Sequence, residues 1–309
     1  MRYLNSMICR QTVASRHGAH CPELPCFPGC SGGFFALLRH PSGYTDFEAQ
    51  GFRASAGRPA ADETRSAGAI RPRQAKRLSS GGISVAGTDY YALNLNSQSL
   101  FRVYDTAIPR VRRYLQAEMD FVKRRLNGSE RVLEVGAGYG RILRELAPSA
   151  HSLVGVDISE DSVRFGREFL KNCANVRLEV MDGHHLDFRD EFDAVLCLQN
   201  GLSAMKGEAS RIVSGCLKAA RPGGRAFFST YSGKFWEHRL AWFEEQAEKG
   251  LLGEIDRERT RDGVIVCKDG FRARTFTEED LIALGQSSGY GYQVQEVDES
   301  SLFLVITKS

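Results

Sequence analysis

Long apolar runs, paired cysteines and basic clusters are all scarce in this sequence of 309 residues. No apolar run approaches the roughly 18 to 20 residues that a membrane span needs, so we expect a soluble, cytoplasmic protein without a membrane partner. The eight cysteines contain no Cys-x-x-Cys pair, and the four beyond residue 100 are scattered through segments typical of buried helix or strand. This usage predicts reduced thiols, no structural disulfide and no metal site.

Excess positive charge is confined to the first eighty residues, which hold eleven Lys and Arg against five Asp and Glu. The remaining residues hold 30 against 33 and are slightly acidic. A nucleic-acid partner needs clustered Lys and Arg to neutralise phosphates, and no such stripe occurs after residue 80. The composition therefore favours a small-molecule substrate and no nucleic-acid partner.

Residues 1–85 lack any sustained apolar period and are dominated by Gly, Ser, Pro, Ala and Arg. Such a composition cannot bury enough surface to offset chain entropy, which predicts a disordered extension. A targeting peptide and an upstream extension from a wrongly assigned start, with translation beginning at Val85, stay open as alternatives. A zinc site is a third alternative, although its ligands lack the usual paired spacing; they would be His17, His20, Cys21, Cys26 and Cys30.

Residues 86–309 alternate apolar strands with amphipathic helices. An initial helix is predicted over 108–126. The strands that follow are predicted over 131–135, 152–156, 176–180, 194–198 and 225–230, with helices around 140–147, 159–172 and 206–219. Apolar strands joined by crossover helices imply a parallel sheet covered by helices on both faces.

The end of the chain predicts antiparallel pairing. Segments 263–268 and 271–276 flank Asp269-Gly270, a pair that favours a two-residue hairpin turn. Thr277 is placed to cap a helix through about residue 288, and 292–297 is placed to pair with 302–308. The expected fold is a Rossmann-like, seven-stranded, mostly parallel sheet with an antiparallel strand in a C-terminal hairpin. Residues 233–276 are extra to this plan and are predicted to form an insertion.

A glycine-rich turn, Gly136-Ala137-Gly138-Tyr139-Gly140, follows the first predicted strand. Such a turn lets backbone N–H groups approach a ligand closely, and Asp157, about twenty residues on, is placed to bind ribose hydroxyls. A dinucleotide fingerprint would need a third glycine at position 141, where this chain has Arg141. Glu134 would repel a diphosphate, whereas it would attract a cationic amino-acid cofactor.

Four segments resemble the class I S-adenosylmethionine-dependent methyltransferases: 133–140, 155–159, 180–183, and 192–195 followed by 221–224. The resemblance covers about residues 90–309 and implies S-adenosylmethionine as cofactor. It places Glu134 near the methionine amino group, Asp157 on the ribose and Asp182 on the adenine amino group. The cofactor-binding residues that it implies are Glu134, Gly136, Ala137, Gly138, Gly140, Asp157, Ile158, Met181, Asp182, Gly183 and Leu198.

The acceptor side is predicted beyond the carboxyl ends of the fourth and fifth strands. Gln199, Asn200, Tyr231 and Ser232 are candidates there, although the favoured role of the two amides is to satisfy loop backbone groups. His184, His185 and His238 are candidate bases, but methyl transfer to a good nucleophile does not require one.

Two further segments are candidates for covering the site. In the insertion, Trp236, Leu240, Phe243 and Ala247 form one helical stripe, which suits a substrate lid or a helix docked on the core. Tyr90, Tyr91 and Tyr104 are candidates to close over the cofactor.

These patterns predict an enzyme that methylates a small molecule, with the acceptor atom and the oligomeric state left open. Two alternatives remain at this point. One is a non-catalytic protein that keeps the cofactor pocket for regulation, and the other is a nicotinamide-dependent oxidoreductase.

Overall fold

The computed structural model describes residues 97–309, so the predicted extension, its alternatives, and Tyr90 and Tyr91 lie outside the described residues. The described helices are α2 (Ser97–Tyr104), α3 (Pro109–Lys123), α4 (Arg141–Leu146), α5 (Glu160–Phe169), α6 (Gly201–Ala204), α7 (Ala209–Ala219), α8 (Trp236–Glu248) and α9 (Glu278–Ser287). The strands are β1 (Arg131–Val135), β2 (Ser152–Asp157), β3 (Val176–Val180), β4 (Phe192–Cys197), β5 (Ala220–Tyr231), β6 (Val264–Val266), β7 (Arg272–Arg274), β8 (Gly291–Val297) and β9 (Ser301–Thr307).

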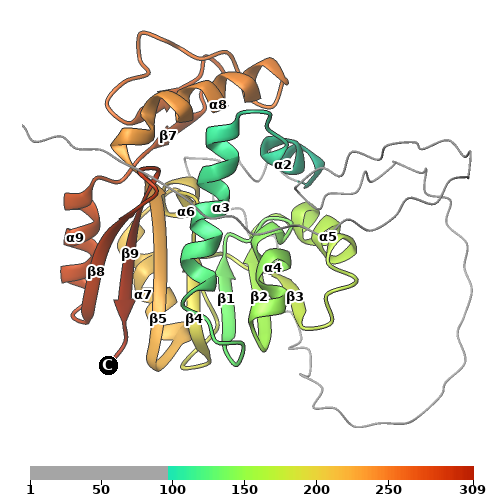
Figure 1. The fold of residues 1–309 in the computed structure, drawn as a ribbon, viewed down its shortest axis with the longest axis vertical. Helices are drawn as coiled ribbons and strands as arrows, with labels where there is room; N and C mark the ends of the chain where they lie inside the picture. The colour runs from blue at the N-terminus through green and yellow to red at the C-terminus, as the bar shows by residue number, and fades with distance from the viewer. Residues whose placement is uncertain (1–96) are drawn as a thin grey trace, which may run out of the picture. The chain divides into compact units, whose positions relative to one another are not determined.

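Seven strands form one sheet in the order β3-β2-β1-β4-β5-β9-β8 (Figure 1). The pairs among β1 to β5 are parallel, while β9 runs antiparallel to both β5 and β8. The predicted seven-stranded sheet with one reversed strand is therefore confirmed. From β1 the chain winds outward to β2 and β3 and then crosses back to β4 on the other side of β1, so the direction of winding switches between β1 and β4. Ligands of such folds bind at this switch point, beyond the carboxyl ends of the parallel strands.

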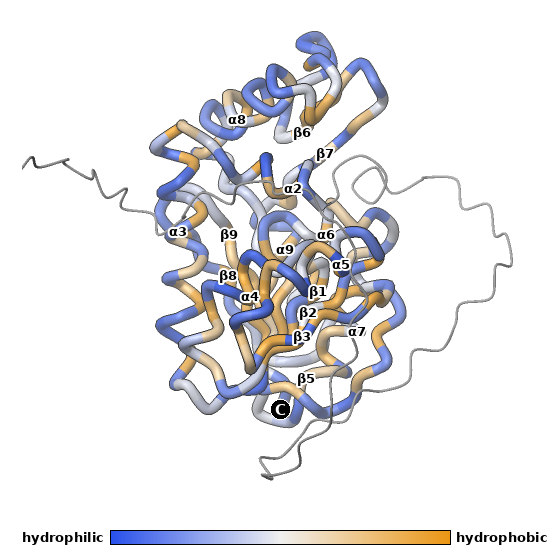
Figure 2. The backbone as a smooth tube through the Cα atoms, turned by 90° about the vertical axis from the view of Figure 1, so that its right-hand side faces the viewer, coloured by the Kyte–Doolittle hydropathy of each residue, from blue (hydrophilic) through white to orange (hydrophobic). Residues whose placement is uncertain are grey.

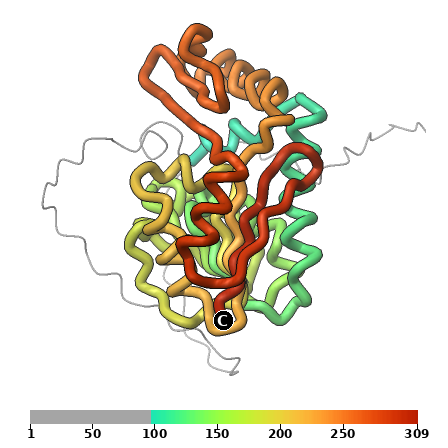
Figure 3. The backbone as a smooth tube through the Cα atoms, turned by 90° about the vertical axis from the view of Figure 1, so that its left-hand side faces the viewer, coloured from blue at the N-terminus to red at the C-terminus, as the bar shows by residue number. Residues whose placement is uncertain are grey.

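Helices cover both faces of the sheet, because its central strands are buried on both sides. Residues of α3, α4 and α5 pack with β1 and β2 in one apolar cluster, and residues of α7 and α9 pack in the other. Figure 2 shows the hydrophobic residues gathered in the strands between these helices. Figure 3 shows α9 and the β8–β9 hairpin together at one end of the sheet.

Local sequence signals set most of the element boundaries. Thr277 caps α9 in a capping box with Asp280, as the sequence predicts. Residues 221–224 form a bulge within β5, since Ala220 pairs with Phe192 and Arg225 pairs with Ala194. The predicted helix 206–219 is α7, which begins at Ala209, and the short helix α6 before it is an additional element that was not predicted.

The β6–β7 hairpin exists, but the two-residue turn predicted at Asp269-Gly270 is wrong. Cys267 N–H donates to the Phe271 carbonyl and Gly270 N–H donates to the Cys267 carbonyl, so three residues form the loop. Gly270 has a φ of 94°, which suits a type I turn followed by a left-handed glycine.

The insertion packs through a third apolar cluster, which joins α8, the β6–β7 hairpin and the N-terminal half of α3. The predicted stripe of α8 is only partly right: Phe243 is buried, whereas Trp236, Leu240 and Ala247 are half-buried. The most buried face instead carries Arg239, Trp242, Phe243 and Gln246. An apolar-only pattern misses this face because Arg239 donates hydrogen bonds to the carbonyls of Gly263 and Ala273 and can therefore be buried.

Candidate functional site

The glycine-rich turn lies directly at the end of β1. Gly136, Gly138 and Gly140 have φ values of 78°, 55° and 83°, in the region that favours glycine. The N–H groups of Gly136 and Ala137 donate to the carbonyl of Val156, which holds the turn against β2. A Cβ on Gly138 would lie 2.6 Å from Leu100 Cδ2 of α2, so α2 covers this turn closely.

Asp157, the last residue of β2, is fixed by backbone groups. Its Oδ2 accepts from Gly138 N–H at 2.8 Å, and its Oδ1 accepts from Ser159 N–H at 2.9 Å. These bonds hold the carboxylate at the pocket wall, where its remaining lone pairs can accept from a pair of ligand hydroxyls.

Glu134 carries a buried carboxyl in the pocket wall, with 3% of its surface exposed. Its Oε2 has no hydrogen-bond partner. Burial raises the pKa of Glu134 to about 8; the charge of Arg141 opposes this shift and that of Asp157 adds to it. A buried carboxyl in this state favours a ligand that brings a positive charge and an N–H donor.

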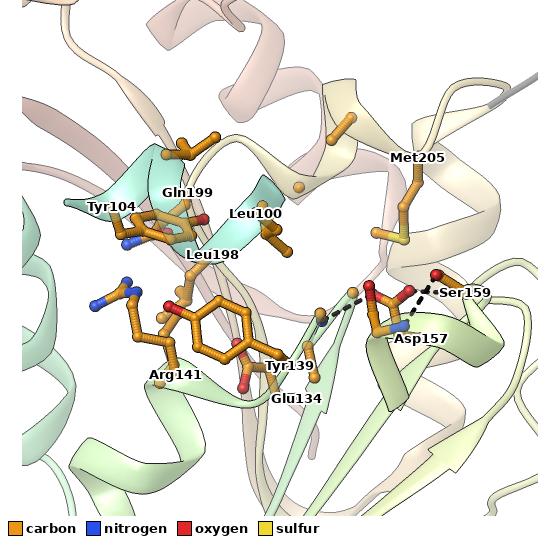
Figure 4. A pocket seen from close by; sticks show the side chains of 18 of the residues that line it. Leu100, Tyr104, Glu134, Tyr139, Arg141, Asp157, Ser159, Leu198, Gln199 and Met205 are labelled. Atoms are coloured by element: carbon orange, nitrogen blue, oxygen red, sulfur yellow. Dashed lines mark hydrogen bonds between the residues drawn. The ribbon is translucent and has the colours of Figure 1, made fainter. Parts of the chain in front are cut away.

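The pocket has two chemically distinct ends (Figure 4). Asp157, Ser159 and Met205 lie at one end, and Tyr104, Gln199 and Arg141 lie at the other. The first end is bordered by Ile158, an apolar residue that is nevertheless 49% exposed. An exposed isoleucine beside Met181 and Met205 offers a flat apolar surface to a planar ring.

Aromatic side chains surround the second end. Tyr104 comes from α2, Tyr231 from the end of β5, and Trp242 and Phe243 from α8, and all four line the pocket. The Trp242 indole N–H donates to the Val103 carbonyl at 3.1 Å, which fixes its ring. Helix α8 therefore supplies part of the pocket wall.

Comparison with known proteins finds a family match for the central segment of the chain, which includes the glycine-rich turn and Asp157. Residues 132–224 match the family model described as a methyltransferase domain. This segment is therefore similar to a methyltransferase domain. A ubiquinone biosynthesis O-methyltransferase from Hydrogenovibrio crunogenus is 30% identical over 124 residues, which cover 39% of this chain and 51% of that protein.

Another sequence relative matches a longer part of the chain, and a solved structure matches its fold. A malonyl-[acyl-carrier protein] O-methyltransferase from Methylococcus capsulatus is 32% identical over 164 residues, 52% of this chain and 56% of its own. A crystal structure of a protein from Pyrococcus horikoshii matches 68% of this chain and 98% of its own with a TM-score of 0.50 at 21% identity. The chain thus spans about half the length of the curated relatives it matches, and the solved structure supports the fold alone.

Most of the predicted cofactor-binding residues line the pocket: Glu134, Gly136, Ala137, Gly138, Asp157, Ile158, Met181, Gly183 and Leu198. Gly140 does not; it precedes α4, and a Cβ there would lie 2.5 Å from Leu170 Cδ1. Asp182 also lies outside the wall. Its oxygens contact His184 N–H and the rings of His184 and His185. Burial alone would raise the pKa of Asp182, but these contacts lower it overall.

Some of the acceptor-side candidates line the pocket and others do not. Gln199 and Tyr231 line the pocket, and the Nε2 atom of Gln199 is buried without a partner. Asn200 does not line the pocket: its Nδ2 donates to the Arg274 carbonyl, and its Oδ1 accepts from Thr230 Oγ1. This is the backbone-satisfying role that the sequence left open for it. His184 pairs with Asp182 outside the wall, and His238 is exposed on α8.

Glu118 is a buried group that sequence reasoning missed. It lies on α3 with no exposed surface, its Oε1 accepts from Ser301 Oγ at 3.0 Å, and its Oε2 has no partner. Burial raises the pKa of Glu118 to about 7, while hydrogen bonds from Ser229 and Ser301 oppose the shift. Its place in an apolar helical pattern was the one available signal, since a Glu on the buried face of a helix needs partners.

The described residues contain no group of three or more His, Cys, Asp or Glu side chains placed to hold a metal ion. No helix within 97–309 is long and apolar enough to cross a membrane. The cysteines in this part of the chain are free thiols, and burial raises the pKa of Cys216 to about 12.

Proposed function

We propose that this chain transfers a methyl group from S-adenosylmethionine to a small-molecule acceptor. The observation that carries the proposal is the buried Glu134 carboxyl, whose Oε2 faces no protein donor beside a glycine-rich turn. A dinucleotide would bring phosphates to this carboxyl, whereas S-adenosylmethionine would bring an ammonium group. The named relatives are methyltransferases, which supports the same class of activity.

The chain's own residues would divide the cofactor between the two ends of the pocket. Asp157 would accept from the ribose hydroxyls, Ile158 and Met181 would pack against the adenine, and Glu134 would accept from the amino group. When bound, S-adenosylmethionine supplies a methyl group on a positive sulfonium, which a nucleophile can displace in line. The residues that line the pocket would orient both molecules and exclude water. Such positioning supplies much of the rate of a displacement of this kind.

The insertion is proposed to form the acceptor side of the site. Its helix α8 places Trp242 and Phe243 in the wall of the pocket that the glycine-rich turn also lines. The same helix is docked on α3 through the third apolar cluster. We therefore propose a fixed wall formed by a docked helix, in place of a separate mobile lid.

Titration calorimetry of the full chain with S-adenosylhomocysteine tests the cofactor, with NADH as the comparison. We expect micromolar binding of S-adenosylhomocysteine, weakened about tenfold or more in Asp157→Asn because a charged acceptor is lost. Asp161→Asn is the matched control, because Asp161 is exposed on α5 and pairs with Arg164. Binding of NADH in place of S-adenosylhomocysteine would overturn the proposal.

A labelled-methyl transfer assay against a metabolite extract tests the activity itself. Incorporation of label that depends on Asp157 is the expected result. Demonstrated cofactor binding with repeated failure of transfer would instead favour a regulatory protein that only senses the cofactor.

A further inference from the structure

The second end of the pocket is a rigid aromatic chamber, which we define by Tyr104, Tyr231, Trp242 and Phe243. Tyr104 and Trp242 have ring centroids 6.2 Å apart, and Trp242 and Phe243 have theirs 6.3 Å apart. The buried guanidinium of Arg239 lies 4.6 Å from the Tyr231 ring centroid and holds this wall from behind. Flat, fixed rings of this kind favour a flat apolar ligand through stacking and edge contacts.

Several polar groups at this end can donate hydrogen bonds. Gln199 Nε2 is buried without a partner, and Arg141, which is 8% exposed, stacks on the Tyr104 ring with its Cζ 4.4 Å from the centroid. Burial raises the pKa of Tyr104 and of Tyr231, so both hydroxyls stay protonated. The chamber therefore offers a positive charge and several donors to an oxygen of the acceptor.

The described side chains that line this end offer no carboxylate or imidazole to take a proton, although the buried carboxyl of Glu118 lies near them and accepts from Ser301. The described residues that line the pocket include no histidine, and their two carboxyls, Glu134 and Asp157, belong to the proposed cofactor contacts. A nucleophile that arrives already ionised needs no base from these lining residues. An ionised oxygen meets this condition, and the cation of Arg141 would favour it over a neutral one.

We propose that the acceptor is a planar aromatic compound that binds as a phenolate, with its ring in the chamber and its oxygen near Arg141 and Gln199. The inference rests on the proposed function and names its substrate class. The phenol loses its proton to solvent before or during binding. The O–CH₃ bond then forms as the S–CH₃ bond breaks, and the electron pair of the broken bond stays on sulfur, giving a methyl ether and a neutral thioether.

Titration calorimetry with 4-nitrophenolate as probe tests this class, with the chain saturated by S-adenosylhomocysteine. The matched comparison is 4-nitroaniline, which has the same shape and no charge. We expect the phenolate to bind at least tenfold more tightly than the aniline at pH 8 and to lose this preference below the pKa of the phenol. Equal binding of both probes, or tighter binding of the aniline, would overturn the inference.

Two arginine variants then locate the oxygen. Arg141→Gln is expected to weaken 4-nitrophenolate binding about tenfold or more. Arg144→Gln should leave it unchanged, because Arg144 lies one turn on in the same helix, is exposed, and stacks on Phe169 away from the pocket. A melting temperature for each variant excludes unfolding as the cause.

The cofactor provides the separating control. S-adenosylhomocysteine and 5′-methylthioadenosine differ by the amino-acid group, so their affinities report whether Arg141 contacts that group. If Arg141→Gln weakens only S-adenosylhomocysteine and leaves 4-nitrophenolate unaffected, the arginine belongs to the cofactor and the inference is wrong. If S-adenosylhomocysteine does not bind to the wild-type chain at all, the proposed function fails before the acceptor is tested.

Discussion

Replacing Glu134 with glutamine should make the protein more stable and its cofactor binding weaker. The carboxyl is buried, and its pKa rises from an ordinary value near 4.5 to about 8. A carboxyl group whose pKa is raised by folding stabilises the folded state fully at a pH below its pKa in the unfolded chain. This stability is lost as pH rises from about 4.5 to about 8. At pH 7 this loss amounts to about 3 kcal/mol relative to a group that stays neutral. The neutral amide should recover about 1–3 kcal/mol of it, less any cost of burying its own N–H groups.

The same carboxyl should make cofactor binding depend on pH. In the free protein Glu134 is mostly protonated at pH 7, whereas an ammonium group bound beside it would favour the ionised form. Binding would then release about one proton at pH 7, and affinity should rise roughly tenfold between about pH 6.5 and pH 8. Glutamine has no proton to release, so Glu134→Gln should bind about 10- to 100-fold more weakly at pH 8 with a flat pH profile.

Titration calorimetry with S-adenosylhomocysteine in two buffers of different ionisation enthalpy measures the affinity and the released proton together. Denaturant unfolding at about pH 5 and pH 8 measures the stability of both proteins. The reasoning is refuted if the variant keeps the wild-type affinity and pH dependence, or if it unfolds more readily at pH 8 than at pH 5 relative to wild type.

Three further changes test the surroundings of the pocket. Gly138→Ala should weaken S-adenosylhomocysteine binding about tenfold in calorimetry, because its Cβ would displace α2, while Gly128→Ala, with nothing within 4 Å, should not. Trp242→Phe removes the hydrogen bond to the Val103 carbonyl and part of the ring volume, so the free energy of denaturant unfolding should fall by about 1–2 kcal/mol. In steady-state kinetics the KM for the acceptor should rise more than the KM for the cofactor. Burial raises the pKa of Glu118 to about 7, so the folded protein loses stability as pH rises from about 4.5 to 7. Glu118→Gln should therefore raise the free energy of unfolding at pH 8 but not near pH 4. Equal destabilisation at both pH values would contradict this.

The sequence by itself determines the sheet and the cofactor end of the site, because both depend on neighbours in the chain. The strands are short apolar runs, Thr277 caps its own helix, and the glycines with positive φ follow β1 directly. Asp157 is placed by its position at the end of β2, next to the β1 turn in the sheet. In each case the physical cause acts within one element or between neighbouring strands.

Only the tertiary structure decides the acceptor end, because its residues come from distant segments. Glu118 meets Ser301 across 183 positions, and Trp242 of α8 meets Val103 of α2 across 139. The buried face of α8 could not be read from apolar periodicity, since Arg239 is buried by carbonyls of the β6–β7 hairpin. Asn200 appeared equivalent to Gln199 in the sequence. Bonds to Arg274 and Thr230 hold Asn200 outside the pocket, whereas Gln199 faces into it.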